Sequence, residues 1–232
     1  LGRIGGPTAR LALMQAFEDP ATDMRPWVVL GLAILERNDP QGGLVDELIT
    51  RIHSESNANT LSAYLIGLGL TGSEQGLATL AEHTLARQVE VAGYAAMALG
   101  LTGQPAAEPM LRDLIRTSSS PFVIRQTAFG LGVLGDTSAI PDLVEVIRTT
   151  NNPFVASYAA LGISLMGDAE AAGPLLDIIE RKGNSGVTTT FAVAAVGQLF
   201  DSDRRPVLSN LAAGSNHLAR IGPVDSLLDL GF

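Results

Sequence analysis

Two stretches of the chain have the spacing of a phosphate-binding glycine loop. GLGLTG (Gly67 to Gly72) and GLGVLG (Gly130 to Gly135) both match G-x-G-x-x-G, a pattern that holds a pyrophosphate where a strand leads into a helix. Here each stretch lies at the end of an apolar helical pattern instead of at its start, and a similar stretch, AMALGLTG, lies in the repeat between them. We therefore interpret these glycines as helix-packing positions.

Other residues that could carry chemistry are sparse. The three histidines, His53, His83 and His217, have no histidine partner three or four positions away on the same helix face, the spacing typical of a zinc site. No serine lies in a G-x-S-x-G elbow, and the chain has no cysteine that could serve as a nucleophile or thiolate ligand. The sequence therefore predicts no enzymatic activity, no metal and no cofactor.

Composition narrows the classes of partner. With 46% hydrophobic and 17% charged residues, the chain is expected to form a packed, soluble protein. A net charge of −9 argues against nucleic acid and against anionic membranes, which both attract basic surfaces. No apolar run is long enough to span a bilayer. The lack of cysteine fits the cytosol and an oxidising compartment equally, so localisation stays open.

An internal repeat of about 32 residues organises the chain. When the turns are aligned, among them Leu35-Glu36, Leu134-Gly135 and Leu199-Phe200, a leucine follows each turn by eight residues. A second, mostly apolar column follows four residues later, on the same helix face. The leucine column is Leu13, Leu44, Leu80, Leu111, Leu143, Leu175 and Leu208, and the second column is Phe17, Leu48, Thr84, Ile115, Ile147, Ile179 and Ala212. The pattern predicts two helices in each repeat.

Local signals mark where these helices begin and how they pack. Ser120-Pro121 and Asn152-Pro153 each place an N-cap residue before a proline at the first helical position. Small residues, including Gly69, Gly100 and Gly132, recur near the ends of the first helices. Because glycine in a helix costs about 1 kcal/mol relative to alanine, its recurrence predicts close approach of a neighbouring helix.

The repeats are expected to form a single solenoid over residues 1–232. A polar stretch from His53 to Thr60 predicts a protruding loop, and Val224 to Leu230 an amphipathic segment within a C-terminal cap, 214–232. LGRIGG at the start matches the end of a first helix, which suggests a piece of a longer array. The expected repeats are 1–20 (partial), 21–54, 58–87, 88–118, 120–150, 152–183 and 187–213.

The repeat resembles a known family. PFVIRQTAFGLGVLGDTSAIPDLVEVIR (Pro121 to Arg148) and its echo PFVASYAALGISLMGDAEAAGPLLDIIE are similar to HEAT repeats, in particular the short bacterial type also found in phycobilin lyase subunits. The resemblance implies an all-α fold, a right-handed α-α superhelix of about six to seven helical hairpins whose second helices line the concave face. It also implies structural roles for Arg125 and Asp136, which match the family's Arg and Asp pair. The repeat alignment gives Gly132 and Gly135 a structural role as helix-packing positions.

One column of the alignment is acidic. Ten residues past the turn, five consecutive repeats carry a carboxylate, at Asp46, Glu82, Asp113, Glu145 and Asp177. The position is either a solvent-facing site neutralised one turn later, by Arg116, Arg148 and Arg181, or a binding ridge that the resemblance places on the concave face.

The functional expectation is a non-enzymatic scaffold whose concave face binds another protein or a peptide of basic character. The alternative, motivated by the repeat type alone, is a bilin lyase or chaperone subunit that handles a tetrapyrrole together with a partner protein. A nucleic-acid-binding HEAT domain is disfavoured, because it would need a basic groove where this chain carries acids.

Overall fold

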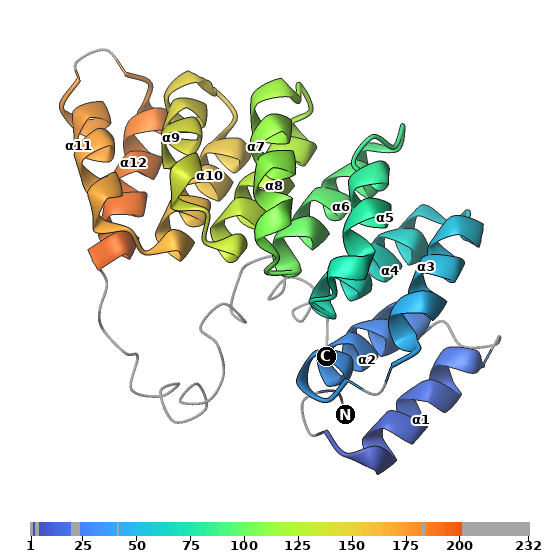
Figure 1. Cartoon of the computed structure of the whole chain (residues 1–232). Helices are drawn as coiled ribbons and strands as arrows, with labels where there is room; N and C mark the ends of the chain where they lie inside the picture. The colour runs from blue at the N-terminus through green and yellow to red at the C-terminus, as the bar shows by residue number, and fades with distance from the viewer. Residues whose placement is uncertain (1, 3–4, 20–23, 41, 182–183, 201–232) are drawn as a thin grey trace.

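The computed structural model describes residues 2, 5–19, 24–40, 42–181 and 184–200. Within these ranges the regular secondary structure is entirely helical, and first and second helices of successive hairpins alternate along the chain (Figure 1). The first helices are α2 (Arg25–Asn38), α4 (Ala58–Leu70), α6 (Val89–Leu101), α8 (Pro121–Leu134), α10 (Pro153–Met166) and α12 (Gly186–Phe200). The second helices are α1 (Pro7–Glu18), α3 (Leu44–Ser54), α5 (Leu77–His83), α7 (Glu108–Thr117), α9 (Ile140–Thr149) and α11 (Ala172–Glu180).

The expected helix starts are confirmed. The Ser120 hydroxyl accepts a hydrogen bond from the Val123 N–H at 3.4 Å, and the Asn152 side chain accepts one from the Phe154 N–H at 3.0 Å. Both bonds satisfy backbone donors that the first turn of a helix leaves free.

Four first helices lead into a glycine with positive φ, a conformation that a side chain disfavours. These are Gly72 (φ 73°), Gly103 (φ 68°), Gly135 (φ 80°) and Gly167 (φ 66°). A single 3-10 turn then leads into each following second helix. The four turns are η1 (Glu74–Gly76), η2 (Pro105–Ala107), η3 (Thr137–Ala139) and η4 (Ala169–Ala171).

Three local expectations differ from the structure. The expected turn at Leu35-Glu36 lies inside α2, which continues to Asn38 because no glycine interrupts it there. Leu199-Phe200 likewise forms the end of α12. The polar stretch from His53 to Thr60 forms no protruding loop, since α3 ends at Ser54 and Asn57 caps α4 through bonds from two backbone N–H groups. Leu208, Ala212 and the cap expected at 214–232 lie outside the described residues.

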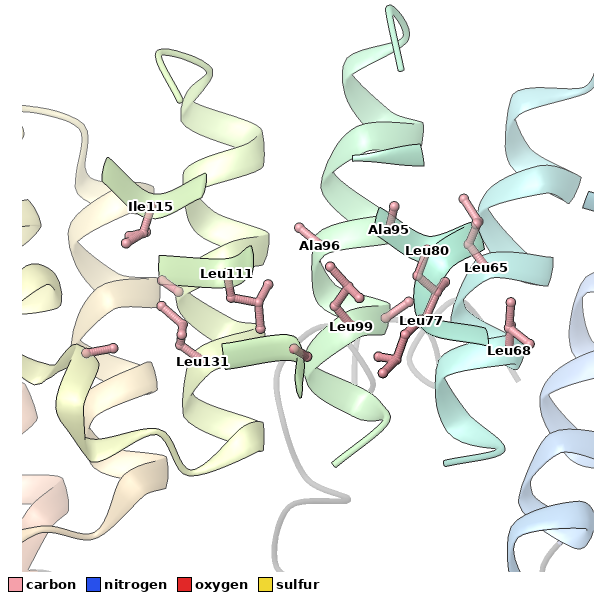
Figure 2. Close-up of a cluster of buried hydrophobic side chains, with 14 of the residues drawn as sticks. Leu65, Leu68, Leu77, Leu80, Ala95, Ala96, Leu99, Leu111, Ile115 and Leu131 are labelled. Atoms are coloured by element: carbon pink, nitrogen blue, oxygen red, sulfur yellow. The ribbon is translucent and has the colours of Figure 1, made fainter. Parts of the chain in front are cut away.

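The core lies between the two layers of helices. All six described members of the leucine column are buried, with Leu13 the most exposed at 8% and Leu143 fully enclosed. Figure 2 shows this core at α4 to α8, where Leu65, Leu99 and Leu111 point between the layers. Because full burial of a leucine contributes about 1.5–3 kcal/mol, this column contributes substantially to the stability of the contact between first and second helices.

Neighbouring first helices touch backbone to backbone. A Cβ added to Gly132 would lie 2.6 Å from the Cα of Gly162, and one added to Gly100 would overlap the backbone of Gly130. The close approach predicted from the recurrent glycines is thus confirmed. Second helices of neighbouring hairpins, such as α7 and α9, contact each other far less than the first helices do.

This difference in spacing decides which layer lies inside the curve. When one layer of a two-layer stack is packed more closely, the stack bends toward that layer. Figure 1 agrees, because α3, α5, α7, α9 and α11 lie along the outer side of the arc and the first helices along its inner side. The family resemblance had placed the second helices on the concave face. We call the solvent side of the second helices the outer face and that of the first helices the inner face.

Candidate functional site

The acidic column lies on the outer face. Its five members, Asp46, Glu82, Asp113, Glu145 and Asp177, are all exposed, and each lies on a different second helix from α3 to α11. The five residues therefore share a solvent-exposed position in successive repeats. The curvature places them on the outer side of the arc instead of inside it.

Arginine neutralises the column in one repeat. The Arg148 Nε donates to the Glu145 carboxylate at 2.8 Å, as expected for an acid and a base one turn apart. Arg116 instead reaches across to Asp142 on α9, donating two hydrogen bonds of 2.9 and 2.8 Å. The hydrogen bond with Asp142 raises the pKa of Arg116 above its usual value. Asp113 is consequently left without a side-chain hydrogen bond or ion pair among the described residues.

The other members of the column have weaker partners. Asp46 accepts a hydrogen bond from the Gln75 side-chain amide at 2.5 Å, which leaves its charge in place. Glu82 lies 3.9 Å from the His53 Nε2, an ion pair only when that histidine is protonated. Asp177 has no hydrogen bond or ion pair with any residue that the structure describes. Four of the five carboxylates therefore form no hydrogen bond or ion pair with an arginine or lysine within the described ranges, although the charge of Asp113 contributes to the raised pKa of Arg116.

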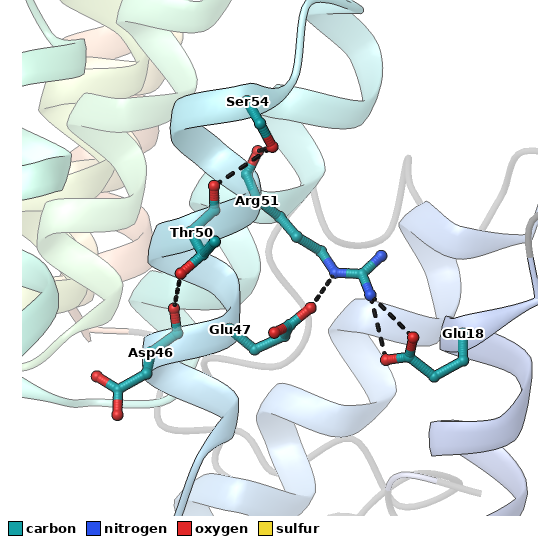
Figure 3. Close-up of polar contacts among 6 residues, drawn as sticks. All are labelled: Glu18, Asp46, Glu47, Thr50, Arg51 and Ser54. Carbon is teal, nitrogen blue, oxygen red and sulfur yellow. Dashed lines mark hydrogen bonds and ion pairs between the residues drawn. The ribbon is translucent and has the colours of Figure 1, made fainter.

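A separate polar network at the N-terminal end of the outer face is structural (Figure 3). The Arg51 Nε donates to Glu47 at 2.5 Å, its terminal nitrogen bonds Glu18 at 3.1 Å, and its guanidinium lies 4.2 Å from the centroid of the Phe17 ring. Burial lowers the pKa of Arg51, but the hydrogen bond with Glu47 and further contacts outweigh it, so the pKa is raised. The network ties α1 to α3. Asp46 contributes only its backbone carbonyl, which accepts a hydrogen bond from the Thr50 hydroxyl, so its carboxylate is left outside the network.

Two histidines that are far apart in the sequence meet in space. The rings of His53 and His83 lie edge to face with centroids 6.2 Å apart. Each Nδ1 lies within hydrogen-bonding distance of the carbonyl four residues earlier, at Ile49 (2.7 Å) and Thr79 (2.8 Å). Within the described residues, no group of three or more histidine, aspartate or glutamate side chains is arranged to hold a metal ion.

Arg125 and Asp136, matched to the family pair, do not meet. Asp136 is 5% exposed, and its carboxylate accepts a hydrogen bond from the Ser138 N–H at 3.1 Å, which caps η3. Arg125 lies instead among aromatic rings on the inner face. Gly132 lies where α8 contacts the neighbouring helix, and Gly135 lies in a turn with positive φ.

The surroundings of Arg125 were not foreseen from the sequence. Its Cζ lies 5.1 Å from the ring centroid of Phe122, 5.2 Å from that of Tyr158 and 5.9 Å from that of Phe154. The rings of Tyr94 and Phe122 pack edge to face at 5.4 Å, which extends the cluster to α6. The signal was present, because α6, α8 and α10 are apolar on every side, whereas helices with one solvent-facing side are usually amphipathic.

None of the described helices combines the length and the apolar composition that a bilayer crossing requires. No curated protein sequence matches the chain. Among solved structures, human deoxyhypusine hydroxylase in complex with glycerol is 16% identical over 85% of this chain and 86% of that chain, with a TM-score of 0.39. A likeness this distant carries no argument about activity.

The family comparison agrees with the helical hairpins. The model of HEAT repeats matches residues 84–161 and, in an overlapping register, residues 108–195. These residues contain the hairpins from α6 to α11, with their glycine turns and buried leucine column. Residues 84–195 of the chain therefore consist of HEAT repeats.

Proposed function

We propose that this protein is a non-enzymatic scaffold that binds a protein or peptide of basic character along the acidic column. The proposal rests on the exposure and the ion pairing of the five carboxylates in this column. Its five carboxylates are exposed on successive second helices, and among the described residues only Glu145 forms an ion pair with an arginine.

The spacing of the column suits an extended partner. Packed helices lie about 8–10 Å apart or more, so five acids on successive hairpins form a line that several basic side chains can follow. A standard protein interface buries about 1,600 Å² in total, which would span several repeats.

Magnitudes indicate what the acids contribute. An exposed ion pair is worth about 0–1 kcal/mol, so the column is expected to steer and orient the partner more than to hold it. Apolar contacts beside the column would supply the remaining affinity. The main effect of changing the acids should therefore appear in the association rate and in its salt dependence.

The test uses the partner recovered by affinity purification with the full-length protein from its native source. We expect Asp113→Arg combined with Asp177→Arg to slow its association about tenfold at low salt, and less at high salt. A matched control, Glu90→Arg with Glu170→Arg, makes the same charge change at exposed acids outside the column.

The two variants separate the possible outcomes. Slower association of the column variant alone supports the proposal. Equal slowing of both variants would assign the effect to net charge, and unchanged kinetics would make the column an ordinary solvent-facing position. Melting temperatures of both variants should remain close to that of the unmodified protein, because all four positions are exposed.

A further inference from the structure

The inner face is apolar where a solvent-facing helix surface is normally polar. From α4 to α12 the five first helices contain only two charged residues, Glu90 and Arg125. From α4 to α10, each first helix packs against second helices on one side and against a neighbouring first helix on each of two others, whereas α12 has one such neighbour, α10. Its fourth side is the inner face, and the apolar residues there have no further layer of described helices above them.

A hydrophobic cluster on this face runs across several repeats. Only Ile66, Met97 and Phe129 in it are buried, and every member belongs to a first helix. At its edge the Phe154 side chain is 64% exposed. A continuous apolar surface of this kind marks an interaction site more often than a free surface. The partly buried members are Leu30, Leu70, Tyr94, Leu101, Val133, Tyr158, Leu161 and Leu165.

Arg125 supplies the single positive charge within this surface. Its Nε is buried without a hydrogen-bond partner, and no ion pair or hydrogen bond joins the guanidinium to another described residue. The rings of Phe122, Phe154 and Tyr158 surround it within 6 Å and restrict its orientation. A guanidinium held in this way is arranged to donate two parallel hydrogen bonds to a carboxylate.

We propose that the inner face binds an apolar peptide segment of a partner protein that carries one carboxylate. The aspartate or glutamate accepts hydrogen bonds from Arg125, and the apolar side chains beside it pack on Phe154, Tyr158 and the neighbouring Val133 and Leu161. The aromatic and arginine content matches the residues that dominate binding energy in protein interfaces. A phosphorylated peptide fits less well, because a dianion would meet a single cation on a chain of net charge −9.

This site is independent of the acidic column. It lies on the opposite side of the solenoid, and the charge of its partner is of the opposite sign. The two proposals can therefore fail separately.

The experiment selects ligands from a random twelve-residue peptide library displayed on phage, using the intact chain. We expect enriched peptides to share an acid flanked by bulky apolar residues. Synthetic copies should bind the Arg125→Gln variant about tenfold or more weakly, as measured by fluorescence anisotropy, because hydrogen bonds to charged groups of this kind are worth about that factor. Arg148→Gln, which removes an arginine from the outer face, should bind them unchanged.

A double-mutant cycle tests whether the contact is direct. Replacing the peptide acid by its amide should weaken binding to the unmodified chain and have little further effect on Arg125→Gln. Phe154→Ser, at an exposed position, should also weaken binding without lowering the melting temperature. The proposal is overturned if no peptide is enriched above background, if enriched peptides lack an acid, or if their binding is insensitive to Arg125. It is also overturned if light scattering shows a dimer that Phe154→Ser dissociates, since a second copy would then cover the face.

Discussion

The outer and inner faces of this solenoid are built from helices with opposite surface chemistry. On the outer face, second helices such as α7 and α9 alternate buried leucine and isoleucine with exposed acids and arginines. On the inner face, first helices such as α8 and α10 are apolar on every side, and Arg125 is their only charged residue. Packing explains much of the contrast, because the first helices touch their neighbours through the backbone and the second helices stand further apart.

An apolar helix does not by itself identify a core. Residues of the first helices that face the second helices, such as Leu131 and Ile163, are fully buried. Phe154 and Tyr158, on the opposite side of α10, are partly exposed to solvent. Burial in the first case stabilises the fold. Partial exposure in the second leaves apolar surface available for a ligand.

The largest expected effect separates the sealed core from the open cluster. Leu143→Ala should lower the free energy of unfolding by about 2–5 kcal/mol, because Leu143 is fully buried and its truncation leaves a cavity. Phe154→Ala should change it by about 0.5 kcal/mol or less, since most of that ring is exposed. Urea denaturation measures both changes in the free energy of unfolding, provided that the m-value, the dependence of this free energy on urea concentration, is the same in both variants. Equal losses would show that the inner cluster is a closed core.

A smaller effect is expected where the first helices touch. Gly100→Ala should destabilise the fold by about 1–3 kcal/mol, because its Cβ would overlap the backbone of Gly130. Gly173→Ala on α11 is the matched control. No atom lies within 4 Å of that Cβ, so alanine should stabilise the helix by about 0.5–1 kcal/mol. If the two variants shift the melting temperature in the same direction, the backbone contact is not formed.

The smallest effect concerns Tyr158 on the inner face. Burial raises the pKa of Tyr158 above its usual value of 10.0, and the nearby charge of Arg125 opposes the rise. Folding therefore favours the neutral phenol, and the stability from this group is present below about pH 10 and lost as pH rises through the raised pKa. Arg125→Gln should raise the pKa further. The pKa of Tyr158 can be measured from phenolate absorbance at alkaline pH, with Tyr158→Phe identifying the signal of this residue. An unchanged pKa in Arg125→Gln would argue against the contact between Arg125 and Tyr158.

Much of the fold was predictable because it depends on short-range patterns. The leucine column follows from one helix face recurring in each repeat, and the caps at Ser120 and Asn152 depend on residues next to them. The expectation failed where a turn was assumed without a glycine, as at Leu35-Glu36. Ile179, placed in the second apolar column, is only partly buried, and its neighbour Ile178 takes the enclosed position.

The candidate sites were predictable in part. The acidic column could be identified because its members share one position in each repeat. The ion-pair partners of these acids could not be identified from the sequence. Arg116, for example, has Asp113 one turn away in its own helix but pairs with Asp142 of the next hairpin. The cluster around Arg125 was missed because its rings come from different repeats, and the family pairing suggested Asp136 as its neighbour instead.

Sequence patterns are sufficient to predict the repeat, the two helices in each hairpin, the buried leucine column and the shared position of the five acids. These features follow from periodicities within one repeat, which hydrophobic burial enforces locally. Which layer lies inside the curve, and therefore which face each candidate site occupies, depends on how the hairpins stack on one another. The curvature arises from glycine backbones meeting across repeats, and that relative spacing of the two layers is a property of the stack rather than of any single hairpin.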